Sequence, residues 1–139
     1  MSLRIGIDIG STTVKVVLLD EQNKLLFRSY ERHYSKSRER AAKTLRSLAD
    51  RLAGRQVRIV ITGSAGLGVA KAAEIDFVQE VYATAAAVNQ YIPDTDAVIE
   101  LGGEDAKIIF FGGALEERMN ASLDPKLPSS LFHVPLVDS

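Results

Sequence analysis

Hydrophobic and polar residues alternate in several stretches of the chain, a spacing that is typical of β-strands. Such alternation, or a short apolar run, predicts strands at Leu3–Ile9, Val14–Asp20, Lys24–Tyr34, Val57–Thr62, Ala97–Leu101 and Ala106–Phe111. Apolar residues at helical spacing, with glycine or proline beside them, predict helices at Lys36–Ala53, Ala65–Ala73 and Gln79–Tyr91. Hairpins and crossover helices are mixed, so the fold class is α/β with a mixed sheet. We expect a five-stranded sheet in the order 3-2-1-4-5, with Val57–Thr62 beside Leu3–Ile9.

The composition excludes several classes of protein. The 139 residues are 46% hydrophobic and 25% charged, which argues against disorder and against a coiled coil. No apolar run approaches the roughly 20 residues of a membrane span and no signal-peptide pattern opens the chain, so we expect a cytoplasmic protein without a membrane partner. The absence of cysteine excludes a disulfide, a thiolate zinc site and a cysteine-held iron–sulfur cluster in this chain. His33 and His133 lie too far apart in sequence for metal-ligand spacing, and His33 is expected on a strand surface.

Charge is unevenly distributed, although the net charge is only −1. Ten basic and three acidic residues lie between Arg28 and Arg58. A basic block can bind nucleic acid, but this one spans a strand and a helix without interleaved aromatic residues. We therefore interpret it as a solvated face and expect no nucleic-acid partner.

An internal repeat carries the main functional signal. Shifting the sequence by 92 residues places IDIGSTTVKVVL (Ile7–Leu18) over IELGGEDAKIIF (Ile99–Phe110), with a match in residue type at each position. Each copy reads as a strand, an acidic residue, a glycine turn and a second strand. A duplicated hairpin of this kind predicts two related ligand-binding turns.

The first copy has the residue types of a phosphate site. Strand periodicity places Gly6, Asp8 and Gly10 opposite a face of isoleucines, on a small and acidic surface that suits a ligand better than a core. Gly10 permits close approach of an anion, and the turn amides can bind phosphate oxygens. Asp8 is expected to hold hydrated Mg²⁺, or else simply to cap the turn. Hydroxyl donors and a cation complete the candidate binding set: Ser11, Thr12, Thr13 and Lys15.

The second copy strengthens the case for a nucleotide. Gly102 and Gly103 repeat the anion-binding turn, and Lys107 repeats the cation. Three carboxylates surround this turn and imply a metal: Glu100, Glu104 and Asp105. Two such hairpins can clamp the phosphates of a nucleotide. We expect metal ligation by Asp8 and Glu100.

Two further features each allow both a functional and a purely structural interpretation. GSAGLG (Gly63–Gly68) follows a strand and precedes a helix, but it matches neither the dinucleotide fingerprint nor a P-loop. It is either part of the binding cleft or a plain turn. Glu80 opens the next helix, where an acid suits the helix dipole; the alternative is a water-orienting role. We count Glu80 with Asp8 and Asp105 as candidate catalytic residues.

Four motifs in the chain resemble a known family: GIDIGSTTVK, ITGSAGLG, FVQEVYATAAAV and DAVIELGGEDAKI. In this order they resemble the activator ATPases of 2-hydroxyacyl-CoA dehydratases and benzoyl-CoA reductases, above all the large multidomain members, in which YERHY also occurs. The resemblance covers about residues 3–120. It implies a ribonuclease-H-like half of an actin-like ATPase, with ATP and Mg²⁺ bound by two phosphate loops.

The resemblance also implies domains and partners. Residues 1–92 would be the first half-domain, 93–120 the opening strands of a second, truncated half, and 121–139 an irregular tail. Family members form a homodimer around a [4Fe–4S] cluster and pass electrons to a CoA-ester dehydratase or reductase. The cluster cysteine would follow Asn120, where ASLDPKLPSS stands instead. We therefore expect the chain alone to be inactive, and to oligomerise through Asp96–Met119. Another kinase of the superfamily, for a sugar or pantothenate, and a non-catalytic phosphate-binding module are the alternatives.

Overall fold

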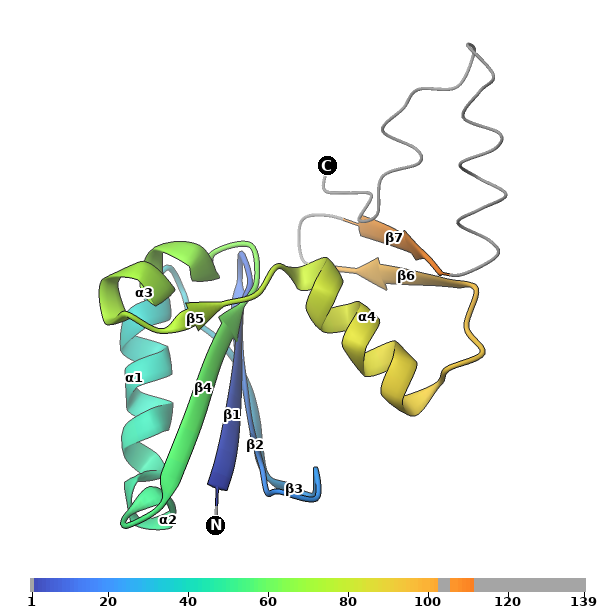
Figure 1. Ribbon diagram of the computed structural model, residues 1–139. Coiled ribbons are helices and arrows are strands. Elements are labelled where there is room, and N and C mark those ends of the chain that lie inside the picture. Colours follow the sequence, from blue (N-terminus) through green and yellow to red (C-terminus); the bar gives the residue numbers. More distant parts are fainter. Residues whose placement is uncertain (1, 103–105, 112–139) are drawn as a thin grey trace. The chain divides into compact units, whose positions relative to one another are not determined.

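The computed structural model describes residues 2–102 and 106–111 of the chain (Figure 1). The chain divides into two units, Met1–Glu80 and Val81–Ser139, which we describe separately. The first unit contains β1 (Ser2–Ile9), β2 (Thr13–Leu19), β3 (Leu25–Arg32), α1 (Ser37–Ser47), α2 (Ala49–Leu52), β4 (Gln56–Thr62), α3 (Gly66–Ala73) and β5 (Asp76–Phe77). The helix α4 (Glu80–Tyr91) and the strands β6 (Ala97–Leu101) and β7 (Ala106–Phe110) follow. No helix in these described ranges is long and apolar enough to cross a membrane.

The first unit is built on a mixed five-stranded sheet in the order β3-β2-β1-β4-β5. The strand β1 pairs antiparallel with β2 and parallel with β4, and β2 pairs antiparallel with β3. The predicted order and the predicted place of Val57–Thr62 beside Leu3–Ile9 are therefore confirmed. The fifth strand, β5, has only two residues and shows no periodicity that could reveal it in the sequence.

One face of this sheet holds the core. Alternate residues of β1 and β2 are at most 2% exposed, as period-two spacing predicts for a half-buried sheet. The helices α1 and α3 cover this face. Ala41 of α1, Ala70 of α3 and Leu48, which lies between α1 and α2, belong to the same cluster. The buried strand residues are Leu3, Ile5, Ile7, Ile9, Val14, Val16 and Leu18.

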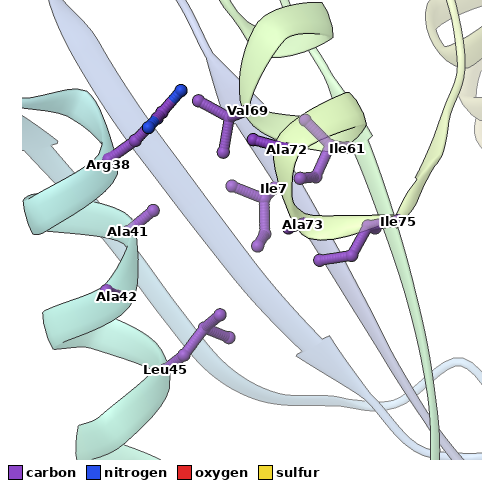
Figure 2. Close-up of a pocket in the computed structure, with 10 residues that line it drawn as sticks. All are labelled: Ile7, Arg38, Ala41, Ala42, Leu45, Ile61, Val69, Ala72, Ala73 and Ile75. Atoms are coloured by element: carbon purple, nitrogen blue, oxygen red, sulfur yellow. The ribbon is translucent and has the colours of Figure 1, made fainter.

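A pocket of about 250 Å³ lies between α1 and α3 on this covered face (Figure 2). Ile7 and Ile61 contribute to its lining, and the small side chains of both helices leave the space open. Among the described residues that line it, Arg38 is the charged one. Since Ile7 and Asp8 are neighbours in a strand, their side chains point to opposite faces, so this pocket is separate from the predicted acidic surface.

Two predicted elements end earlier than the sequence suggests. The predicted helix Lys36–Ala53 is two helices, because the regular ladder is interrupted at Leu48. The Ser47 hydroxyl donates to the Thr44 carbonyl at 2.6 Å, and the Leu48 amide donates to Leu45 O, three residues back. The strand predicted to reach Tyr34 ends at Arg32, because Tyr34 has a positive φ of 48°.

In the second unit, β6 and β7 form an antiparallel pair, as the repeat predicts. The last part of the predicted second half, residues 112–120, and the predicted tail at 121–139 lie outside the described residues.

Candidate functional site

The face of the sheet opposite the core carries a polar row that crosses four strands. Asp8 on β1 is the register partner of Thr62 on β4 and of Lys15 on β2, and Lys15 is the partner of Tyr30 on β3. Side chains at directly paired positions lie on the same face of a sheet. Four residues far apart in the sequence therefore form one continuous surface.

Asp8 uses only one of its carboxylate oxygens within the chain. Oδ2 lies 3.2 Å from Lys15 Nζ, and the two side chains are 31% and 38% exposed. The ammonium group of Lys15 also lies 5.4 Å from the centre of the Tyr30 ring. Asp8 Oδ1 is buried and has no hydrogen-bond partner among the described residues, and the same holds for Thr62 Oγ1. Buried polar atoms without partners are costly, so this pair is where a ligand or water is expected to bind.

The turn after β1 leaves backbone donors unused. The Gly10 amide donates to Thr13 O at 2.9 Å, which closes the turn. Within the described residues, the amides of Ser11 and Thr12 donate to no acceptor. A Cβ added at Gly10 would meet nothing closer than 3.7 Å, so the fold itself does not require glycine here. A glycine that the fold does not require fits a close approach by a ligand.

The glycine-rich turn after β4, GSAGLG (Gly63–Gly68), packs directly against the end of β1. Gly63 has a φ of 104°, and a Cβ there would lie 2.2 Å from Ile9 O and 2.6 Å from Asp8 Oδ1. The Ala65 amide donates to Ile9 O at 2.9 Å. Of the two interpretations left open, the structure favours a turn that borders the Asp8 surface and for which glycine is obligatory.

The second hairpin repeats the register of the first. Asp8 pairs with Lys15 in the first copy, and Glu100 pairs with Lys107 in the second, at positions 92 residues further along. Lys107 is 5% exposed, whereas Lys15 is half-buried. Gly102 follows β6 directly and is exposed. The candidates Gly103, Glu104 and Asp105 lie outside the described residues.

Of the remaining candidates, Thr13 begins β2 and Glu80 begins α4. The structure thus brings together the first-copy residues Asp8, Gly10 and Lys15 with the turn between them. Glu80 lies in α4, Glu100 in β6 and Lys107 in β7.

Three residues at or near this surface were missed or misplaced by sequence reasoning. Thr62 and Tyr30 had no distinguishing local pattern, because only strand pairing brings them beside Asp8 and Lys15. The expectation that His33 lies on a strand surface is wrong. It lies beyond the end of β3, is only 6% exposed, and its ring contacts Gly10 O at 2.9 Å. One signal could have suggested this contact. His33 lies near the end of a predicted strand, and that strand pairs with the second strand of the hairpin that contains the glycine turn.

The residues present fit a hydrated magnesium ion better than a bare one. Among the described residues no three metal-ligating side chains cluster. Mg²⁺ commonly keeps most of its waters and uses one or two carboxylates together with substrate phosphates. The free oxygen Asp8 Oδ1 and the hydroxyl Thr62 Oγ1 supply that kind of outer contact. A [4Fe–4S] cluster does not fit, because thiolates hold such clusters and this chain has no cysteine.

The sheet order, with an acidic residue and a glycine turn at the end of β1, defines the class of the actin-like, ribonuclease-H-like ATPase fold. Within that class, the chain belongs to the BadF/BadG/BcrA/BcrD ATPase family, whose model matches residues 5–121. A comparison with curated protein sequences gives no match.

Solved structures support the same fold. The chain is similar to component A of (R)-2-hydroxyglutaryl-CoA dehydratase from Acidaminococcus fermentans, with 19% identity and a TM-score of 0.67 over 82% of this chain and 44% of that one. It is also similar to the activator of 2-hydroxyisocaproyl-CoA dehydratase from Clostridium difficile with bound ADPNP, with 25% identity and a TM-score of 0.60 over 79% and 41%. A Ppx/GppA family member from Aquifex aeolicus matches at 17% identity and a TM-score of 0.50 over 81% and 48%. The chain therefore spans less than half the length of these structures.

Proposed function

We propose that this chain supplies the first phosphate-binding part of an ATP-hydrolysing activator of a 2-hydroxyacyl-CoA dehydratase-type enzyme. Family membership supports ATP chemistry, and two similar structures carry the names of dehydratase activator components. The second of them has ADPNP bound, which supports a nucleotide as the ligand.

One observation carries the proposal: backbone donors without an acceptor follow closely after a carboxylate oxygen without a donor. The amides of Ser11 and Thr12 lie in the turn that follows Asp8, whose Oδ1 is buried without a partner in the described part of the chain. Amide donors attract phosphate oxygens, whereas a carboxylate repels them unless a cation lies between. Phosphate with magnesium satisfies both sets of atoms, and either one alone leaves the other unsatisfied.

In this proposal the chain's residues bind and orient the nucleotide. The turn at Gly10 binds the terminal phosphates, and Lys15 shares its charge between Asp8 and a phosphate oxygen. Bound Mg²⁺ would neutralise charge that develops on the phosphates. Asp8 holds the hydrated ion, and Glu80 or Asp105 would orient the attacking water.

The repeated hairpin would supply the second phosphate loop. In its register Glu100 pairs with Lys107, as Asp8 pairs with Lys15 in the first copy, which supports this proposal. We propose that Gly102, Gly103 and Glu104 contact the phosphates from this side, with Glu100 as a second metal contact. Because the chain has no cysteine, no electron-transfer step is proposed for it.

A titration of the ¹⁵N-labelled chain with Mg-ATP tests the proposal. We expect the Ser11 and Thr12 amide peaks to shift, with a dissociation constant of about 1 mM and no detectable hydrolysis, since the chain spans less than half the length of the similar structures. AMP, which lacks the terminal phosphates, is the control and should leave both peaks in place. Peaks that do not move at about ten times that concentration of Mg-ATP contradict the proposal. Micromolar binding would show instead that this chain suffices for the pocket.

A further inference from the structure

His33 is buried beneath the glycine turn, and each of its polar groups is used. The backbone amide of His33 donates to Thr12 O at 3.0 Å, and its carbonyl accepts from the Lys36 amide at 2.7 Å. Its ring nitrogen Nε2 lies 2.9 Å from Gly10 O. A single residue therefore contacts two carbonyl oxygens of the turn that contains the unused amides.

The hydrogen-bond network assigns one tautomer to the ring. The Ser35 amide can only donate, and it lies 3.1 Å from His33 Nδ1, so Nδ1 accepts and carries no proton. Nε2 then carries the proton and donates to Gly10 O. The ring is neutral in this arrangement, because a charged imidazole would have protons on both nitrogens.

The backbone that follows His33 is held in an unfavourable conformation to make this contact. Tyr34 and Ser35 have φ angles of 48° and 63°, and neither is a glycine. Consecutive left-handed residues of this kind are strained and persist where the surrounding structure requires them. Here they bring the Ser35 amide back to the His33 ring.

The consequence for the turn follows from peptide geometry. Gly10 C=O and Ser11 N–H belong to the same trans peptide group and point in opposite directions. When Nε2 holds Gly10 O, the Ser11 amide is directed away from His33, and it meets no acceptor among the described residues. The peptide that joins Thr12 and Thr13 is held in the same way by the His33 amide.

We propose that His33 is a positioning residue that aims the Ser11 amide at a bound phosphate. The inference rests on the proposed function, because it requires a phosphate ligand at the turn. His33 itself contacts no ligand. It acts through Gly10 O and lowers the cost of ordering the turn when the phosphate binds.

Two variants of similar length and volume test this role. His33→Gln retains an N–H donor near the position of Nε2, and His33→Met fills the same space without a donor. We expect the dissociation constant for Mg-ATP to rise about tenfold in the Met variant and to stay within about threefold of the parent chain in the Gln variant. The ¹H–¹⁵N spectrum of each variant establishes that it is folded. A folded Met variant that binds Mg-ATP as tightly as the parent chain overturns the proposal.

Two further measurements separate this inference from the proposed function. Amide hydrogen exchange at Gly10, whose N–H closes the turn onto Thr13 O, should be faster in the Met variant and near normal in the Gln variant, with or without nucleotide. If the parent chain does not bind Mg-ATP, the proposed function fails, whereas unchanged exchange in the Met variant overturns the role of His33. If neither variant folds, the tautomer of His33 is measured instead in the parent chain, from the ¹⁵N spectrum of its imidazole ring. A proton on Nδ1 instead of Nε2 overturns the inference.

Discussion

Replacing Asp8 should separate binding from stability, because the carboxylate is poorly satisfied in the folded chain. Asp8→Ala removes a buried oxygen, Oδ1, that has no partner among the described residues. Leaving such an atom unsatisfied costs about 1–3 kcal/mol. The same change removes the ion pair with Lys15, but at 31% and 38% exposure such a pair contributes only about 0.2–1 kcal/mol. We therefore expect the free energy of unfolding to stay the same or to rise by up to about 3 kcal/mol.

The assay is urea unfolding, followed by the amide peaks of β1 and β2 so that only the first unit is measured. Mg-ATP titration of the same variant should show that magnesium no longer strengthens ATP binding, and in a catalytically complete protein that carries this unit, Mg-dependent hydrolysis should be lost. A residue that lowers stability while supporting binding is typical of a functional site.

Thr62→Val is the matched control for the expected change in unfolding free energy. It removes the neighbouring buried hydroxyl that also has no partner in the described residues, and it keeps the shape of the side chain. We expect a rise of about 1 kcal/mol in unfolding free energy and a weaker but still measurable magnesium dependence, because Asp8 keeps its contact with the hydrated ion. If Asp8→Ala instead lowers the unfolding free energy by more than about 1 kcal/mol, Asp8 maintains the fold and our reasoning is wrong.

The two glycine turns should respond differently to the same substitution. Gly10→Ala should leave stability nearly unchanged, since the added Cβ meets nothing within 3.7 Å, but it should weaken Mg-ATP binding; equal affinity by titration would show that no phosphate approaches this residue. Gly63→Ala should destabilise the first unit by several kcal/mol in urea unfolding, because its φ is 104° and the Cβ would lie 2.2 Å from Ile9 O, and a normal unfolding midpoint would contradict the described turn. We also expect sedimentation to show a dimer or larger assembly formed through Asp96–Met119, which Phe110→Asp should dissociate, because a two-stranded pair with exposed apolar residues is a pairing template. A monomer at high concentration would refute this last expectation.

The sequence by itself determined the elements whose evidence is local. Period-two spacing revealed β1 and β2, and it showed which face of β1 is buried. The repeat at a shift of 92 residues predicted a second hairpin, and the structure confirms that Asp8–Lys15 and Glu100–Lys107 are equivalent pairs. Such features can be read from the chain because strand alternation and turn composition depend on residues that are neighbours in sequence.

Tertiary structure alone decided what surrounds Asp8. Thr62 reaches Asp8 only because β4 pairs in parallel with β1, and no local pattern distinguishes it from other strand threonines. His33 lies 23 residues from Gly10, and its burial depends on the pairing of β3 with β2 and on two left-handed residues that a sequence pattern does not predict. The side-chain and backbone partners of the glycine turn come from separate strands. Their roles were therefore set by the sheet, which brings distant residues within hydrogen-bond distance.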